Sequence, residues 1–213
     1  KYLTCNASAV TDSLYLGRAW GASFEFTNKD GDQLMLGIMN DHNEHRFTSA
    51  DNDIFMRGIK RLSKHSTLGA SVLVGQHSLS DSRSLPIQRF GIDYQLKTDN
   101  LRLDSEAIYS NGYNGLDEVR SRSLGWYVGS AYTVNKNVDL VGFIDWFDPN
   151  LDLCSNDLFD DDVNASMRYV VGVNYYFSRK KERRLMLNYE WKTPTEGPKI
   201  NTNGFYMRYS FEF

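Results

Sequence analysis

The sequence contains no long apolar run. No stretch approaches the ~18 consecutive apolar residues that suggest a membrane-spanning helix, the mean hydropathy is -0.50, and 41% of the residues are hydrophobic. These values exclude a helical membrane protein. A basic surplus is also missing, because the formal net charge is -3, and we expect no nucleic-acid partner. The one basic run, at 179–184, is predicted to be a solvated turn, with contact to anionic headgroups as the alternative.

Residue types that catalyse reactions or bind metals are few and poorly placed. His42 and His45 share a predicted loop with acidic residues but lack a fixed scaffold. His77 neighbours serines but has no placed acid or amide partner for a lipase-like site. The acidic stretch at 157–162 lacks the glycine of a calcium-binding EF-hand loop, and no phosphate-binding glycine loop occurs. We therefore expect no enzyme, no metal site and no cofactor.

Two cysteines and the start of the chain leave two questions open. Cys5 and Cys154 could form a bridge in an oxidising compartment, but nothing in the sequence positions one. The sequence begins at Lys1 with neither an initiating Met nor a signal peptide. We expect it to be either a mature chain or a fragment.

Apolar and polar residues alternate with a period of two in nearly every ordered stretch. The clearest case is the final segment, whose alternate positions are Phe205, Met207, Tyr209, Phe211 and Phe213. Successive side chains of a strand point to opposite faces, so this segment has one aromatic face and one largely polar face. No convincing helical period occurs, and the sequence predicts an all-β, antiparallel fold.

The period and the turn residues together predict eleven strands. They are expected at 14–26, 32–40, 53–63, 67–78, 86–97, 101–110, 122–134, 138–147, 166–177, 183–192 and 204–213. Lys1–Ala9 is expected as a twelfth, because a closed barrel with both ends on one side needs an even number. Arg57, Lys60 and Arg61 interrupt the alternation of 53–63, so we expect a β-bulge or a rim position there.

The predicted connections alternate in length. Those near 41–52, 80–86, 111–122, 148–164 and 193–203 are medium or long, whereas those at 28–31, 63–66, 98–100, 135–137 and 178–183 are short. A barrel of the bacterial outer membrane has short periplasmic turns and longer extracellular loops. The tryptophans agree, because all four fall in the outer halves of their predicted strands: Trp20, Trp126, Trp146 and Trp191. Aromatic residues near the inner ends complete the second expected girdle: Phe26, Tyr132, Phe177 and Phe213.

The two faces differ in the solvent that suits them. One face carries Leu, Val, Tyr and Trp, and the other carries Gly, Ser, Asn and charges of both signs. A soluble barrel would have to enclose the whole apolar set, whereas a membrane barrel turns it toward lipid. We therefore expect residues 1–213 to be a single transmembrane β-barrel domain. By parity its lumen is lined by Arg89, Asp93, Lys97, Arg102, Asp104, Glu106, Asp139, Asp145, Arg168, Glu190, Lys192 and Arg208, together with Glu25 and Glu212.

The aromatic final segment resembles the closing strand of bacterial outer-membrane barrels. The resemblance implies that its apolar row, Phe205, Met207, Tyr209, Phe211 and Phe213, forms the signal read by the barrel-insertion machinery.

The last third of the chain also resembles the phosphate-selective porins of the O and P type. The likeness rests on the motif Asp145–Asn150, an acidic outer loop, the strand Arg168–Phe177 and the closing strand. It implies a passive channel in an outer membrane, with a homo-oligomer left open. Members of that family have about sixteen strands, so this chain is interpreted as the C-terminal part of a larger barrel or as a barrel of about twelve. The lysine- and arginine-rich constriction of an anion channel is not found.

These observations predict a porin for passive diffusion of small hydrophilic solutes, with anions such as phosphate left open. The alternative is a non-conducting barrel that acts as a structural or partner component of an outer-membrane complex. A barrel of about eight strands is filled by side chains and one of about sixteen leaves a channel, so twelve strands leave conduction undecided. The expected partners are outer-membrane lipid and lipopolysaccharide, the insertion machinery and the solutes.

Overall fold

The structure is a computed structural model of the whole chain. It describes Thr4, Ser8 and residues 21–40, 52–78, 84–112, 121–152, 165–177, 183–196 and 200–211. Within these ranges eleven strands form one antiparallel sheet in which neighbours in sequence are neighbours in space. The strands are β1 (Gly21–Thr27), β2 (Gln33–Asn40), β3 (Asn52–Arg61), β4 (Ser66–Ser78), β5 (Ser84–Lys97), β6 (Leu101–Gly112), β7 (Ser121–Asn135), β8 (Val138–Asp148), β9 (Ser166–Tyr176), β10 (Arg183–Pro194) and β11 (Thr202–Phe211). No helix among the described residues is long and apolar enough to cross a membrane.

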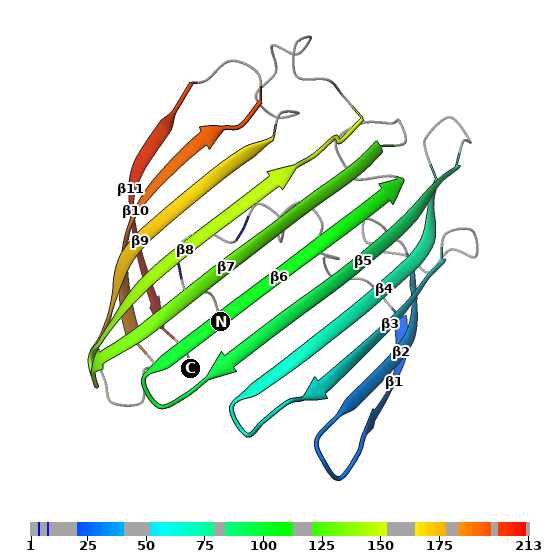
Figure 1. Cartoon of the computed structure of the whole chain (residues 1–213), viewed down its shortest axis with the longest axis horizontal. Helices are drawn as coiled ribbons and strands as arrows, with labels where there is room; N and C mark the ends of the chain where they lie inside the picture. The colour runs from blue at the N-terminus through cyan, green and yellow to red at the C-terminus, as the bar shows by residue number, and fades with distance from the viewer. Residues whose placement is uncertain are drawn as a thin grey trace.

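The sheet is strongly curved, with β1–β3 and β9–β11 bending back on opposite sides of a trough (Figure 1). Within the described part of the chain, β1 and β11 each pair with a single strand, so the sheet has two edges. The predicted closure into a barrel of about twelve strands is therefore not made by these eleven. Of the expected twelfth strand, Lys1–Ala9, all but Thr4 and Ser8 lie outside the described residues.

The eleven strands agree closely with those expected from the period of two, but the β-bulge, one of the two alternatives expected for 53–63, is wrong. β3 pairs with β2 and β4 in unbroken register, so it has no bulge. Arg57 and Arg61 fall on the same face as Asp53 and continue the alternation, while Lys60 lies on the other face at the strand end. There its Nζ bonds an Asp32 carboxylate oxygen at 2.7 Å. A register shift occurs instead between Thr133 and Asn135 of β7.

Short connections gather at one end of the sheet, as predicted (Figure 1). Their polar side chains satisfy the backbone of each turn: the Asn28 Oδ1 accepts the Asp32 N–H at 2.8 Å, and the Asn135 Oδ1 accepts the Asn137 N–H at 2.9 Å. Asn and Asp favour turns because their side chains can bond to the backbone two to four residues away. Local turn chemistry thus accounts for the tightness of these two short connections.

The convex face is apolar over the whole sheet. Phe24 is 84% exposed, Met207 71% and Val171 62%, which is unusual for large apolar side chains facing water. Near the long-connection end, Trp126 pairs with Trp146 across β7 and β8, and Trp191 pairs with Tyr169. Near the other end, aromatic rings of Tyr175, Phe177, Tyr209 and Phe211 contact one another at centroid separations of 5.0 to 6.2 Å. These positions match the two predicted girdles; Trp20 and Phe213 lie outside the described residues.

Candidate pore wall

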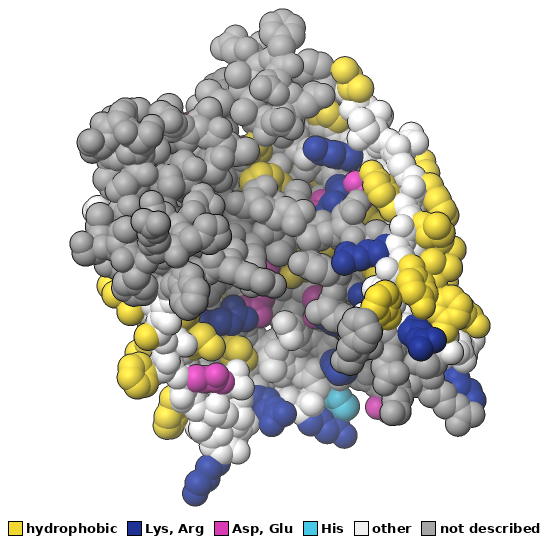
Figure 2. Space-filling model, turned by 180° about the vertical axis from the view of Figure 1, so that it is seen from behind, with side chains coloured by type: hydrophobic (Ala, Val, Ile, Leu, Met, Phe, Trp, Pro, Cys, Tyr) yellow, Lys and Arg dark blue, Asp and Glu magenta, His cyan; other side chains and the backbone are white. Residues whose placement is uncertain are grey.

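The concave face of the sheet carries the charged side chains. All twelve predicted lumen residues lie on the face opposite the exposed apolar rows, because each pairs in register with other residues of that polar face, as Asp145 does with Arg168. Viewed from behind, the trough shows Lys, Arg, Asp and Glu side chains, with hydrophobic side chains on its outer flank (Figure 2). Glu25 also lies on this face, and Glu212 is outside the described residues.

Sequence reasoning missed several members of this face. Asp53 is fully buried on β3, and Arg57 and Arg61 lie further along the same face of this strand. Arg184, expected in a solvated turn, is part of β10 and is 8% exposed. Its Nε donates a hydrogen bond to the Ser210 Oγ of β11 at 3.1 Å. If the alternation of faces had been followed through β3 and into the basic run at 179–184, it would have found all four residues: Asp53, Arg57, Arg61 and Arg184.

Three glycines of the concave face leave room for polar side chains from neighbouring strands. A Cβ at Gly69 would collide with the Asp93 carboxylate, one at Gly75 with the Asp53 carboxylate, and one at Gly172 with the Asn188 side chain. The absent side chain therefore lets a polar group from the next strand lie flat on the sheet. This arrangement keeps charged groups close to the wall of the trough.

A buried ion network joins β8, β9 and β10. Arg168 Nη2 donates to Asp145 Oδ2 at 2.7 Å and its Nε donates to Asp145 Oδ1 at 3.3 Å. Glu190 Oε2 lies 3.6 Å from Arg168 Nη1 on the other side, and the guanidinium is 5.6 Å from the centre of the Phe143 ring. The Arg168 side chain is 11% exposed and that of Asp145 1%. Two-point binding between carboxylates fixes the guanidinium in place.

A second polar cluster lies on the same wall, nearer the short-turn end of the sheet. Asp139 accepts hydrogen bonds from the Tyr176 hydroxyl and the Thr133 hydroxyl, each at 2.8 Å. Asp139 is 6% exposed.

The two remaining predicted residues of this wall lie outside the Asp139 cluster. Lys192 faces Arg168 in register, and Arg208 lies on the edge strand β11 beside β10.

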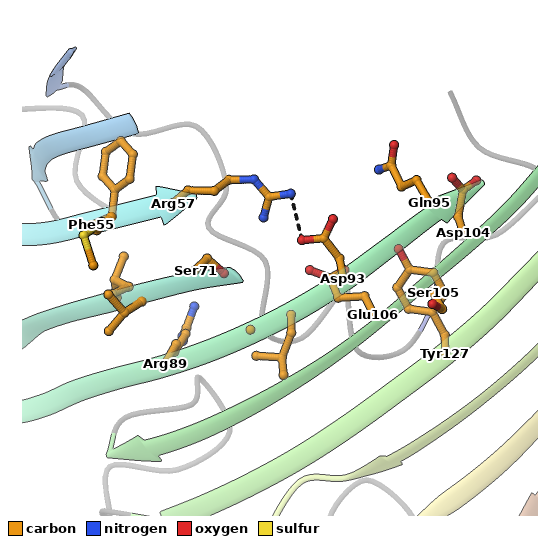
Figure 3. Close-up of a pocket in the computed structure, with 15 residues that line it drawn as sticks. Phe55, Arg57, Ser71, Arg89, Asp93, Gln95, Asp104, Ser105, Glu106 and Tyr127 are labelled. Carbon is orange, nitrogen blue, oxygen red and sulfur yellow. Dashed lines mark ion pairs between the residues drawn. The ribbon is translucent and has the colours of Figure 1, made fainter. Parts of the chain in front are cut away.

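The wall formed by β3 to β7 is different, because it contains a pocket of about 490 Å³. Its charged lining residues are Arg57, Arg89, Asp93, Asp104 and Glu106. Arg57 Nη2 bonds Asp93 Oδ2 at 2.8 Å, reaching over β4, and the Arg57 side chain is 31% exposed. Figure 3 shows the guanidinium of Arg57 extending across the pocket toward Asp93. Arg102 and Asp104 form a further ion pair at 2.7 Å. Lys97 pairs in register with Arg102 near the short-turn end.

Glu106 and Tyr127 complete the far side of this pocket. They share a side-chain hydrogen bond, and the Tyr127 ring stacks on Phe143 with centroids 5.4 Å apart. Phe143 also lies beneath Arg168, so this ring connects the pocket with the buried network. The arrangement presents charged groups of both signs to the trough.

The predicted insertion row lies on the convex face of β11. Phe205, Met207, Tyr209 and Phe211 are all more than half exposed, and they face Tyr189, Leu187, Leu185 and Arg183 of β10 in register. Phe213 lies outside the described residues. The row is therefore placed as the alternation predicts, while its role as a signal stays a prediction.

Other sequence candidates fall where the structure describes no side chain. These are Cys5, His42, His45, Cys154 and the acidic stretch at 157–162, together with the side chain of His77. Among the described residues, no three His, Cys, Asp or Glu side chains are grouped to hold a metal ion.

Two solved structures share this fold. An anion-selective porin from Comamonas acidovorans matches with a TM-score of 0.62 and 10% identity over 89% of this chain and 54% of that one. OmpT, an outer-membrane protein of Vibrio cholerae folded in vitro and described in its trimer form, matches with a TM-score of 0.61 and 8% identity over 90% of this chain and 64% of that one. This chain thus spans between about half and two thirds of their lengths.

The family comparison is more extensive than the resemblance seen in the last third. No curated protein sequence matches this chain significantly. The family model for phosphate-selective porins O and P, however, matches residues 9–213. The described strands have the porin architecture, and the chain lies in the bacterial outer membrane. This chain is a member of the phosphate-selective porin O and P family.

Proposed function

We propose that this chain forms the wall of an aqueous pore that lets small hydrophilic solutes diffuse passively across the outer membrane. In this proposal residues 1–213 act as one transmembrane domain. The observation that carries the proposal is the separation of the two faces: charges line the trough, and large apolar side chains cover the outside. Family membership supports a channel in preference to an enzyme.

Anions such as phosphate are included among the proposed solutes. The phosphate-selective family and the anion-selective porin of Comamonas acidovorans are both named for anions, and the trough of this chain contributes Arg57, Arg89 and Arg184. Acidic residues accompany these arginines throughout, so we propose weak selectivity. The partners proposed with it are membrane lipid, lipopolysaccharide, the insertion machinery that reads the β11 row, and further copies of the chain.

The test is conductance of the purified full chain in a planar lipid bilayer. The expected result is discrete current steps, with a reversal potential in a KCl gradient that lies near zero. A folded, inserted chain without steps would contradict the pore and favour the non-conducting structural barrel. That second candidate has one supporting observation, the tight pairing of Arg168 with two acids, which could equally fill a lumen.

Two neighbouring positions provide a matched control for the orientation of the wall. Gln95 lines the concave pocket, whereas Leu96 of the same strand points the other way. In a chain with Cys5 and Cys154 replaced by serine, a charged water-soluble thiol reagent is expected to change the current through Gln95→Cys. The same reagent is expected to leave Leu96→Cys unchanged. Equal responses would show that the two faces have been assigned wrongly.

A further inference from the structure

The charges around the β3–β7 pocket are separated by sign. Arg57 and Arg89 lie on one side with Phe55 and Ser71, and Asp104, Glu106 and Tyr127 lie on the other, with Asp93 between them (Figure 3). The lining thus contains two cations and three anions. Inside a hollow with low-dielectric walls, such an arrangement produces a field directed across the pocket.

Two of these groups retain capacity for a ligand. Arg57 has five N–H donors on its guanidinium and is paired with Asp93 alone among the described residues. Glu106 accepts from Tyr127 and forms no ion pair within the described part of the chain. The Arg57 guanidinium is held by Asp93, and Asp93 stands opposite Glu106 in the register of β5 and β6. A donor group and an acceptor group with remaining capacity therefore line the same hollow on either side of Asp93.

The charge balance decides which solutes suit the pocket. Asp93 and Asp104 are paired with Arg57 and Arg102, whereas Glu106 has no ion partner among the described residues. A free phosphate ion would be repelled by Glu106, and a simple cation would be repelled by the two lining guanidinium groups. A molecule with a carboxylate at one end and an ammonium at the other gains from both sides. The pocket volume of about 490 Å³ falls within the range that small-molecule sites occupy, roughly 300–1,000 Å³.

The remaining lining suits the body of such a molecule. Phe55, Leu73 and Ile108 add apolar surface to the lining, which can contact a short hydrocarbon segment. Ser71 and Gln95 add neutral polar groups for an amide.

We infer that this pocket is a subsite for small zwitterions, namely free amino acids and short peptides, with their carboxylate toward Arg57 and their ammonium toward Glu106. The inference rests on the proposed function, because it assigns a solute class to one part of the pore wall. It differs from a phosphate site, since the lining places the Glu106 carboxylate beside the arginines.

The experiment is binding to the purified full chain in detergent micelles at pH 7, measured by isothermal titration calorimetry. The probes are glycylglycine, its N-acetyl derivative, which lacks the ammonium, its amide, which lacks the carboxylate, and inorganic phosphate. Glycylglycine is expected to bind about tenfold more tightly than each single-charge analogue, because each loses one charge-assisted hydrogen bond. Tighter binding of phosphate, or equal binding of all four probes, would overturn the inference.

Conservative variants assign the two ends of the ligand. Glu106→Gln is expected to weaken glycylglycine about tenfold and to leave the N-acetyl derivative unchanged. Arg57→Gln is expected to weaken the N-acetyl derivative and to spare the amide. Glu196→Gln, the same substitution outside the pocket lining, is the matched control and is expected to change neither. If Glu106→Gln binds glycylglycine as the unaltered chain does, the subsite is wrong.

Conductance in KCl separates this inference from the proposed pore. Current steps without preference for glycylglycine would overturn the subsite and keep the pore. Selective binding without current steps would overturn the pore and keep the subsite as a feature of a non-conducting wall.

Discussion

The β8–β10 wall and the β3–β7 wall use similar charged residues for different purposes. In the first, Arg168 is held by Asp145 and Glu190, rests near Phe143 and is 11% exposed. In the second, Arg57 has one ion partner and is 31% exposed, and Glu106 has no ion partner among the described residues. Burying a charge is costly unless it is fully paired, so the first set acts as structure. The second set stays available to water and solute.

The comparison predicts very different costs for removing one acid from each wall. Asp145→Ala removes the two-point partner of the buried Arg168 guanidinium and leaves the more distant Glu190 as its acidic neighbour, and breaking a buried pair costs about 3 kcal/mol or more. Asp93→Ala releases Arg57 into the trough, where water can solvate it, and is expected to cost about 1 kcal/mol. Urea unfolding in lipid vesicles, followed by tryptophan fluorescence, measures both. Equal losses would show that the two walls are electrostatically alike.

Gly172 of the β8–β10 wall and Gly69 of the β3–β7 wall extend the comparison of the two walls to the backbone. A Cβ at Gly172 would meet the Leu187 carbonyl oxygen as well as the Asn188 amide, whereas the three atoms nearest to one at Gly69 all belong to the Asp93 side chain. The Asp93 side chain can rotate away from a new Cβ, whereas the Leu187 backbone is held in place by strand pairing. Gly172→Ala is therefore expected to cost about 3 kcal/mol and Gly69→Ala about 1 kcal/mol in the same unfolding assay.

Gly58 provides the control for these two substitutions. A Cβ there would have no heavy atom within 4 Å, because it points out of the convex face beside Ile54 and Met56. Gly58→Ala is expected to change stability by less than about 0.5 kcal/mol. If Gly58→Ala lowered the free energy of unfolding as much as Gly172→Ala, the loss would come from the change in strand propensity. The contacts around the glycines would then not explain it.

Ion selectivity separates the walls by function. Removing the Glu106 charge is expected to raise the chloride-to-potassium permeability ratio about two-fold, the effect of one charge about 8 Å away in water that is screened by about 0.15 M salt. Glu190→Gln is expected to have a smaller effect, because the Arg168 network partly neutralises Glu190. The reversal potential in a KCl gradient measures each ratio. A larger shift from Glu190→Gln would reverse the assignment of the two walls.

The sequence was sufficient for the strands and their faces, because the period of two and the turn residues are local properties. It predicted the concave position of Asp145, Arg168 and Glu190 for this reason. It missed Arg57, whose neighbours Lys60 and Arg61 made the strand look irregular, although parity alone separates them.

Contacts beyond adjacent strands could not be predicted. The Arg57–Asp93 pair spans β4 and depends on the missing side chain at Gly69, and the Gly69–Asp93 pairing is known only when the register is known. Closure is a global property of the same kind. Alternation repeats identically in every strand, so it says which face is wet but does not fix how many strands complete the wall.

The smallest expected effect concerns an exposed ion pair at the short-turn end, outside both walls. The hydrogen bond from Lys60 Nζ, helped by the Arg61 backbone N–H, lowers the pKa of Asp32 below its ordinary 3.8. A lowered folded-state pKa means that the folded protein holds this proton less tightly than the unfolded chain. The stabilisation is therefore complete above pH 3.8 and is lost as the pH falls through the folded value. Asp32→Asn is expected to remove this acid dependence in urea unfolding between neutral and acidic pH. Because Lys60 is 64% exposed and water screens the pair, the change should be much smaller than that of Asp145→Ala. An equally large change would mean that the turn, and not the buried network, limits the stability of the sheet.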